Sequence, residues 1–239
     1  LLAVFPTGGG KSITFQLPAL MSGENAKGLT IVISPLQSLM KDQVDNLEKA
    51  EITDAVTING LLDPIERAKS FERVEDGSAS ILYISPESLR SRTIERLILG
   101  RNVVRFVIDE AHCFSAWGQD FRVDYLYIGD FIRSIQEKKN MAEPIPVSCF
   151  TAKAKQKVIE VIRSYFREKL SLEFEVFASK ASRTNLHFKV LAQTDAVQKY
   201  QTLRRLLEAK SCPTIIYASR THRATELARC LTRDGFPAR

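Results

Sequence analysis

Two short segments, far apart in the chain, carry groups that could act together on a phosphate ester. The first is FPTGGGKS, residues 5–12, in which three successive glycines precede a lysine and a serine. Backbone N–H groups that no side chain covers can surround a phosphate, and the N-terminus of a following helix adds partial positive charge. A glycine turn beside a surface lysine is the alternative. The residues expected to bind the phosphates are Thr7, Gly8, Gly9, Gly10, Lys11 and Ser12.

Phe5 makes this segment an incomplete match to the usual phosphate-loop motif. That motif is G-x-x-x-x-G-K-[ST], and Phe5 stands where its first glycine is expected. Lys11 would still reach the β- and γ-phosphates of a nucleotide, and the Ser12 hydroxyl would ligate Mg²⁺. The rest of the chain therefore has to decide between a nucleotide site and a glycine turn.

The second segment, VVRFVIDEAH at residues 103–112, places two carboxylates at the end of an apolar run. A nucleotide–Mg²⁺ site needs a carboxylate at a neighbouring strand end, and Asp109 fits that role. Hydrolysis needs a base that orients and deprotonates water, and Glu110 fits that role. An acidic pair after a strand is more often an ordinary loop. Together with GGGKS, however, it predicts a site that hydrolyses a nucleotide.

Short apolar, β-branched runs alternate with segments of helical spacing over residues 1–178. Residues 35–47 and 153–166 each place mostly apolar side chains on one helical face, and Gln43 is the polar member of the first face. Apolar strands between amphipathic helices indicate an α/β fold with a parallel sheet covered on both faces. Such sheets bind ligands at the carboxyl ends of their strands. The expected strands lie within residues 1–5, 29–34, 54–58, 80–85, 103–109, 145–150 and 172–177.

The polar stretch SKASRT, residues 179–184, interrupts this alternation. After it, NLHFKV (185–190) and PTIIYAS (213–219) have strand character, whereas residues 196–209 and 221–235 have helical character. We therefore predict a first domain at 1–178, a linker at 179–184 and the first half of a second α/β domain at 185–239. The chain starts with Leu1 and stops where a further strand is expected, so we expect a piece of a longer protein.

Two further features suggest a polymer substrate. The segment after DEAH holds the single Trp of the chain, and Trp117, Phe121 and Arg122 stand among polar, turn-prone residues. Bases stack on such rings for about 1–3 kcal/mol each, and an arginine can hold a phosphate. Anchoring of Trp117 and Phe121 in the core is the alternative. Thr151 could hydrogen-bond Asp109 or Glu110, or cap the helix that follows, and the sequence leaves both roles open.

The composition is that of a globular protein with a real core, at 44% hydrophobic and 26% charged residues. The net charge of +6 favours polyanions slightly, and residues 151–170 hold six Lys or Arg against two Glu, a pattern that a solvated helix face also explains. Four scattered cysteines indicate reduced thiols. No apolar run approaches the roughly 18 residues of a membrane span. We expect no membrane partner and a cytoplasmic location, nucleoid-associated if bacterial.

With these residues in hand, the chain resembles the RecQ family of superfamily 2 DNA helicases. The resemblance spans residues 1 to about 220, in the family's order and spacing. Two of its segments, ISPLQSLMKDQVDNL and DEAHCFSAWGQDFR, are highly specific to the family. Phe5 is also similar to this family, which relaxes the first glycine of the motif. The segments are FPTGGGKSITFQLPAL, ISPLQSLMKDQVDNL, ILYISPESL, DEAHCFSAWGQDFR, FTAKA and IIYASRT.

The resemblance implies a P-loop NTPase with a RecA-like parallel sheet, followed by part of a second RecA-like domain. It also implies ATP and Mg²⁺, and 3′-to-5′ translocation on single-stranded DNA with unwinding of duplex DNA in recombination and repair. The implied partners of this monomer are single-stranded DNA and duplex junctions. Asp109 would then bind magnesium together with Ser12, and Glu110 would activate water. His112 and Thr151 would couple hydrolysis to DNA. The expected DNA contacts are Ser34, Pro35, Leu36, Trp117, Phe121, Arg122, Ser219 and Arg220.

The chain departs from the family at two places. Lys153 replaces the second Thr of the usual T-A-T-A segment, which affects how Thr151 would pass on the nucleotide state. The glutamine motif, the arginine finger and the zinc-binding and winged-helix modules of the family have no counterpart in these residues. We therefore expect residues 1–239 alone to bind nucleotide weakly and not to unwind DNA. A nucleic-acid clamp without processive unwinding and an RNA helicase are the alternatives, and the WGQDFR segment favours DNA.

Overall fold

The computed structural model describes residues 1–6, 8–115, 122–152, 155–178, 186–192, 195–209 and 212–238. It forms two compact units, Leu1–Ser182 and Arg183–Arg239, and each is described by itself. Some residues that the sequence singled out lie outside the described part of the chain, so their predicted roles stay predictions. They are Thr7, Trp117, Phe121, Lys153 and the linker at 179–184.

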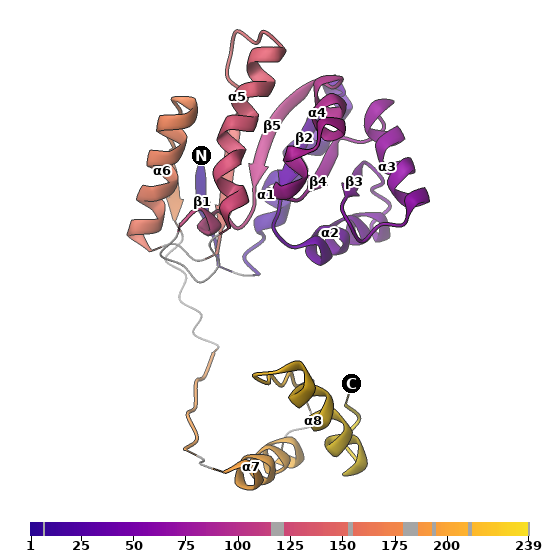
Figure 1. The fold of residues 1–239 in the computed structure, drawn as a ribbon, viewed down its shortest axis with the longest axis vertical. Coiled ribbons are helices and arrows are strands. Elements are labelled where there is room, and N and C mark those ends of the chain that lie inside the picture. The colour runs from indigo at the N-terminus through magenta and orange to yellow at the C-terminus, as the bar shows by residue number, and fades with distance from the viewer. Residues whose placement is uncertain are drawn as a thin grey trace. The chain divides into compact units, whose positions relative to one another are not determined.

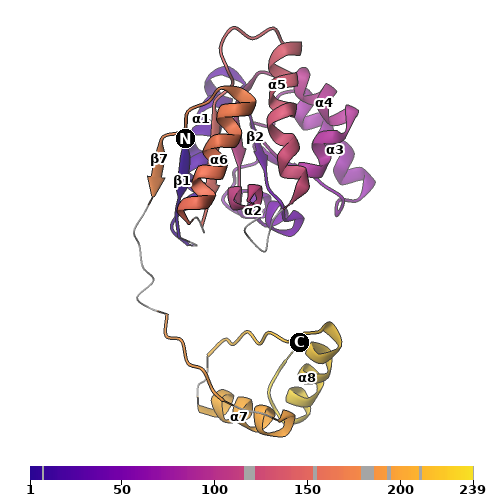
Figure 2. The same cartoon turned by 60° about the vertical axis from the view of Figure 1, so that its left-hand side comes forward.

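The first unit is built on a seven-stranded sheet in the order β3-β4-β2-β5-β6-β1-β7, with every pairing parallel (Figure 1). Each strand lies in or overlaps one of the seven predicted runs, so the predicted α/β fold is confirmed. Figure 2 shows β1 and β7 together at one edge of this sheet. The strands are β1 Leu2–Val4, β2 Leu29–Ile33, β3 Ala55–Ile58, β4 Ile81–Ile84, β5 Val103–Ile108, β6 Val147–Thr151 and β7 Val176–Ala178.

Helices cover both faces of the sheet, and each face has its own apolar core. α1 and α2 supply Phe15 and Met40 to one core, whereas α3 to α6 pack into the other, with Phe131 of α5 and Phe166 of α6 fully buried. Burial of apolar surface at roughly 25 cal/mol per Å² stabilises both layers. The helices are α1 Lys11–Ala26, α2 Gln37–Lys49, α3 Pro64–Glu75, α4 Arg92–Leu99, α5 Ile128–Lys138 and α6 Gln156–Leu170, with short 3₁₀ helices at Pro86–Arg90, Ala111–Phe114 and Val123–Tyr127.

Helix α2 shows how the apolar pattern is used. Met40, Val44 and Leu47 are buried against the sheet, as the pattern predicts. Leu36 and Leu39 stand on the same predicted face but are 43% and 41% exposed: Leu36 precedes α2, which begins only at Gln37, and Leu39 lines a pocket. The predicted helical face is therefore correct from Met40 onwards.

The second unit holds two helices, α7 Ala196–Ala209 and α8 Thr221–Arg233, as predicted. Tyr200 of α7 donates a hydrogen bond from its hydroxyl to Asp234 beyond α8, at 2.9 Å. The described residues of NLHFKV and PTIIYAS, however, form no strand. A strand needs a paired neighbour to satisfy its backbone groups, and the described part of this unit supplies none. Phe188 and Val190 are consequently more than 90% exposed.

Within the described residues, no helix combines the length and the apolar character that crossing a membrane requires.

Candidate nucleotide-binding site

The glycine segment leaves strand β1 at the carboxyl edge of the sheet. One residue beyond β1, the Phe5 N–H donates to the Thr151 carbonyl at 3.0 Å, and the partly buried Phe5 side chain packs against the core, so Phe5 continues the strand rather than joining the loop. Gly8 and Gly10 have φ values of +80° and +78°, a backbone region that favours glycine. A Cβ on Gly9 would lie 2.9 Å from the Pro6 carbonyl oxygen. Side chains other than hydrogen would therefore strain this turn.

Helix α1 begins at Lys11 without a side-chain cap. Its N-cap residue is Gly10, and no side chain accepts a hydrogen bond from the first turn. The first N–H groups of a helix have no partner inside the helix, and they carry partial positive charge. The turn thus ends in a set of backbone donors that can bind an anion.

The acidic pair follows β5 at the same edge of the sheet, because β5 and β1 both pair in parallel with β6. The Asp109 N–H donates to the Ile33 carbonyl at 2.9 Å, and the Tyr125 hydroxyl donates to the Asp109 carbonyl at 2.8 Å. Glu110 has left-handed backbone angles, with φ +49° and ψ +44°. This conformation is uncommon for a residue with a side chain, and strained residues of this kind cluster at functional sites.

Lys11 connects the two segments. Its Nζ lies 2.7 Å from Asp109 Oδ1 and 3.3 Å from Glu110 Oε1. Burial opposes the lysine charge, but the charges and hydrogen bonds of Asp109 and Glu110 outweigh burial and raise the Lys11 pKa. The lysine is therefore a cation that is held between two carboxylates.

His112 and Thr151 extend this cluster towards the end of β6. His112 Nδ1 lies 3.2 Å from Glu110 Oε2 and 3.1 Å from Thr151 Oγ1. The hydrogen bond with His112 lowers the pKa of Glu110, and burial, which acts in the opposite direction, does not offset it and the charge of Lys11. A cap by Thr151 on the following helix is wrong, because α6 begins at Gln156 with Lys155 as its N-cap residue.

A pocket of about 320 Å³ joins the phosphate segment to the acidic pair. Ser12 and Asp109 both line it. A hydroxyl and a carboxylate suit Mg²⁺, which usually takes one or two carboxylates and completes its shell with phosphate and water. Among the described residues no group of three His, Cys, Asp or Glu could form a closed metal cage. The donor set thus fits a metal that arrives with phosphates. The pocket is lined by Pro6, Gly8, Gly10, Lys11, Ser12, Ile13, Phe15, Ser34, Leu39, Met40, Gln43, Tyr83, Asp109 and Glu110.

Among the described residues, those predicted to contact DNA in the first unit lie at the same edge. Ser34 is buried, and its N–H donates to the Ile84 carbonyl at 3.0 Å. Arg122 donates from Nη1 to the Pro35 carbonyl at 3.1 Å and lies 3.7 Å from Glu87. Arg122 therefore joins the ends of three chain segments, a contact that the sequence did not suggest. Leu36 is half-exposed beside them.

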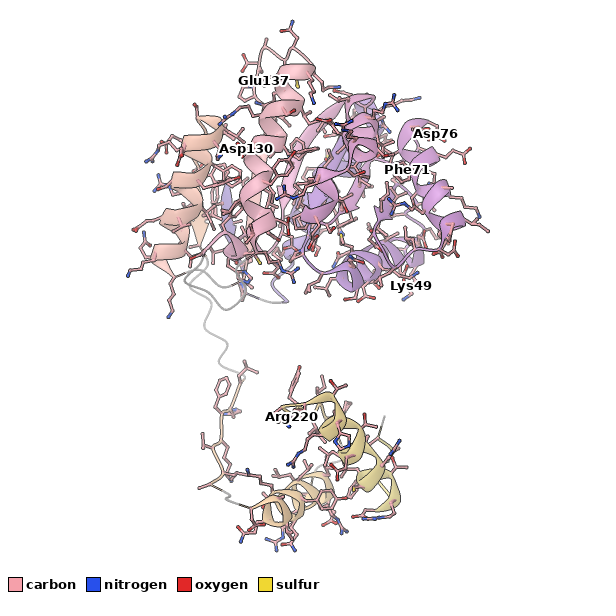
Figure 3. All side chains as sticks on the ribbon, in the orientation of Figure 1. Lys49, Phe71, Asp76, Asp130, Glu137 and Arg220 are labelled. Atoms are coloured by element: carbon pink, nitrogen blue, oxygen red, sulfur yellow. The ribbon has the colours of Figure 1, made fainter. Side chains whose placement is uncertain are left out.

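Ser219 and Arg220, the predicted DNA contacts of the second unit, are exposed, and Arg220, which is labelled in Figure 3, is the N-cap residue of α8. They line a pocket of about 910 Å³, together with residues of α7 such as Lys199 and Tyr200.

Three of the six basic residues at 151–170 form ion pairs within the described part of the fold. Arg163 and Arg167 both pair with Glu173, and Lys169 pairs with Asp130 of α5 at 2.9 Å. The interpretation as a solvated helix face with local ion pairs is therefore favoured over a nucleic-acid surface on α6.

Three further polar residues lie beside the pocket and were not assigned from the sequence. Gln16 of α1 donates from Nε2 to Gln43 of α2 and to the Tyr83 hydroxyl of β4, at 2.9 Å each. A signal was present in the sequence: Gln43 is the polar member of an otherwise apolar helical face.

Comparisons with known proteins agree with this geometry. The family model described as DEAD/DEAH box helicase matches residues 1–162. A probable ATP-dependent DNA helicase RecS of Bacillus subtilis is 34% identical over 228 residues, which cover 95% of this chain and 42% of that protein. The ATP-dependent DNA helicase RecQ of the same organism is 41% identical over 189 residues, which cover 79% of this chain and 29% of that protein.

The fold also matches solved helicase structures. A structure of Mss116p bound to single-stranded RNA and AMP-PNP has a TM-score of 0.71 at 16% identity, over 98% of this chain and 49% of that one, and it supports the fold alone. The chain spans less than half the length of the curated relatives described above. From its family match and its relatives, the chain belongs to the DEAD/DEAH box helicases and, among them, to the RecQ family.

Proposed function

We propose that the protein is an ATP-dependent DNA helicase, in which this chain supplies the nucleotide site and part of the DNA track. The observation that carries the proposal is the approach of Lys11 to Asp109 and Glu110 beside an uncapped helix N-terminus. The relatives named as ATP-dependent DNA helicases support the choice of DNA and ATP. The first RecA-like domain corresponds to 1–178, and 185–239 begins a second one.

The first step of the mechanism is an exchange of partners by Lys11. Before nucleotide binds, Asp109 and Glu110 neutralise its charge. The incoming β- and γ-phosphates compete for Lys11 and are bound by the backbone N–H groups of Thr7 to Gly10 and of the first turn of α1. This exchange frees the Asp109 carboxylate, which together with the Ser12 hydroxyl would hold Mg²⁺. The metal, when bound, neutralises charge on the phosphate oxygens.

Glu110 is the proposed base. Its lowered pKa keeps it ionised at neutral pH, so it can accept a hydrogen bond from water and orient it. The departure of Lys11 towards phosphate removes a cation that lowers the Glu110 pKa, and the carboxylate becomes a stronger base when nucleotide is in place. His112 holds the other oxygen of Glu110 and contacts Thr151. His112 therefore connects Glu110 to Thr151, the last residue of β6.

DNA would follow the carboxyl edge, along Ser34 to Leu36 and the segment with Trp117, Phe121 and Arg122. Ser219 and Arg220 would contact it from the second unit. We propose single-stranded DNA and duplex junctions as substrates for a monomer, located in the cytoplasm and on the nucleoid if the source is bacterial.

The test is the ATPase rate of the whole protein with single-stranded DNA, with RNA and without nucleic acid. We expect strong stimulation by DNA and weak stimulation by RNA; equal stimulation by both would overturn the choice of DNA. Trp117→Ala should remove the stimulation and keep the basal rate if the protein is a motor. Loss of DNA affinity with an unchanged response of the bound fraction would instead indicate a clamp.

A further inference from the structure

Three polar side chains form a hydrogen-bonded bridge, hereafter the glutamine bridge, within an apolar layer of the first unit. It consists of Gln16 on α1, Gln43 on α2 and Tyr83 on β4. The Gln16 side-chain amide uses both of its N–H donors, one for each partner, at 2.9 Å. Gln16 is 6% exposed and Tyr83 is 2% exposed. Gln16 and Tyr83 are therefore buried, Gln43 is half-buried, and both N–H donors of Gln16 are satisfied.

Packing alone does not call for an amide here. The neighbouring side chains of this layer are apolar, among them Phe15 and Met40. Burial of an amide costs free energy that its hydrogen bonds largely offset, and an apolar side chain of similar size would avoid that cost. A directional network instead defines one arrangement of the elements it joins. The bridge thus specifies how α1, α2 and β4 lie relative to one another.

Each member of the bridge stands next to a segment with a proposed role. Gln16 is in the second turn of α1, the helix that starts with Lys11. Gln43 belongs to α2, which starts directly after Leu36. The chain leaves β4 at Ile84 towards Glu87, the neighbour of Arg122.

The bridge also borders the nucleotide pocket. Gln43 and Tyr83 line that pocket together with Lys11, Asp109 and Glu110. Burial, assisted by the charge of Asp109, raises the pKa of Tyr83 to about 12 despite the bond from Gln16. The hydroxyl therefore stays neutral and keeps its hydrogen bond over the physiological pH range.

We propose that Gln16 is a positioning residue that links the state of the phosphate segment to the DNA-track residues Ser34 to Leu36. The inference rests on the proposed helicase function. When Lys11 exchanges carboxylates for phosphate, it acts on the helix that also carries Gln16. A shift of α1 against α2 and β4 has to break or re-form two directional bonds, so the movement passes between two discrete arrangements rather than through a continuous slide.

The test is the ratio of DNA-stimulated to basal ATPase in the whole protein. Gln16→Leu should lower this ratio about 3- to 30-fold, the range found for residues that modulate coupling between sites. The dissociation constant of a fluorescent ATP analogue and the basal rate should change less than about threefold, because Gln16 does not line the pocket. Tyr83→Phe removes one of the two bonds and should lower the ratio in the same direction by less.

Controls separate positioning from packing. Gln156→Leu removes an exposed glutamine of α6 and should leave the ratio unchanged. Gln43→Leu, at a half-buried position, repeats the measurement of the ratio in case Gln16→Leu does not fold; nucleotide affinity is not compared in this variant, because Gln43 lines the pocket. If Gln16→Leu and Gln43→Leu lowered the melting temperature but left the ratio of DNA-stimulated to basal ATPase unchanged, the positioning role of Gln16 would be refuted. The helicase proposal would be unaffected. A wild-type protein without DNA stimulation would overturn the helicase proposal and the bridge with it.

Discussion

The two units differ in the sign of their charge. Residues 1–182 hold 23 Lys or Arg and 24 Asp or Glu, a net charge of −1, whereas residues 183–239 hold 11 and 4, a net charge of +7. The groups that can act on a nucleotide, Lys11, Asp109 and Glu110, all belong to the nearly neutral unit. Long-range attraction of a polyanion therefore resides in the second unit. The candidate nucleotide-site residues and the excess of positive charge therefore lie in separate parts of the chain.

The units also differ in how they bury apolar surface. The first closes two cores around a complete parallel sheet. The second buries no residue of α7 and only Leu231 of α8, and it leaves Ile215 and Tyr217 more than three-quarters exposed. Because burial supplies most of the folding free energy, the stability of the described residues is concentrated in the first unit. A substitution in the first unit should then affect nucleotide hydrolysis and leave the attraction of a polyanion unchanged, and a substitution in the second unit should do the reverse.

The largest expected effect is that of Glu110→Gln. Loss of the base should lower the DNA-stimulated ATPase rate about 100-fold or more, since general-base catalysis contributes about 10²–10⁴. Nucleotide affinity should be kept or increase, because Lys11 loses one of the carboxylates that compete with phosphate. Steady-state ATPase and titration of a fluorescent nucleotide measure both.

The matched control for this change lies in the second unit. Glu208→Gln alters an exposed carboxylate on α7 and should leave the rate unchanged. If Glu110→Gln retained more than about a tenth of the rate, Glu110 would not be the base, since that loss is below the range of general-base catalysis.

Residue patterns predicted the fold of the first unit and the core of its site. Seven apolar runs became seven parallel strands, and parallel pairing brings Lys11 to the carboxylates that follow β5. Other contacts depend on side-chain geometry that no local pattern encodes. The bond of Arg122 to the Pro35 carbonyl and the place of His112 between Glu110 and Thr151 are of this kind.

For PTIIYAS, by contrast, the sequence predicts a strand that the structure does not form. Its apolar, β-branched composition is typical of a buried strand, yet no described residue pairs with it. Composition expresses a preference for pairing, but a strand also requires a partner.

A moderate effect is expected from Arg220→Ala in the charged unit. Removal of one phosphate contact should weaken binding of single-stranded DNA by a similar factor for all sequences and reduce the slope of log K against log salt by about 0.7. Nucleotide affinity should not change. Arg92→Ala, at an exposed position of α4 in the first unit, is the control. An equal loss of DNA affinity in both variants would refute the assignment of attraction to the second unit.

The smallest expected effect is the dependence of folding stability on the ionisation of Glu110. Its folded pKa lies below the ordinary value of 4.5 because of the bond with His112 and the charge of Lys11. A carboxylate with a lowered folded pKa contributes stability that is present above its unfolded pKa and is lost as pH falls through its folded pKa. The melting temperature of the nucleotide-free protein should therefore exceed that of Glu110→Gln at pH 7, and the difference should shrink as pH falls below 4.5. For a partly exposed group the contribution is at most about 1 kcal/mol. If the difference in melting temperature grew as pH fell, the folded state would disfavour the ionised form of Glu110. The contacts with Lys11 and His112 would then not determine its pKa.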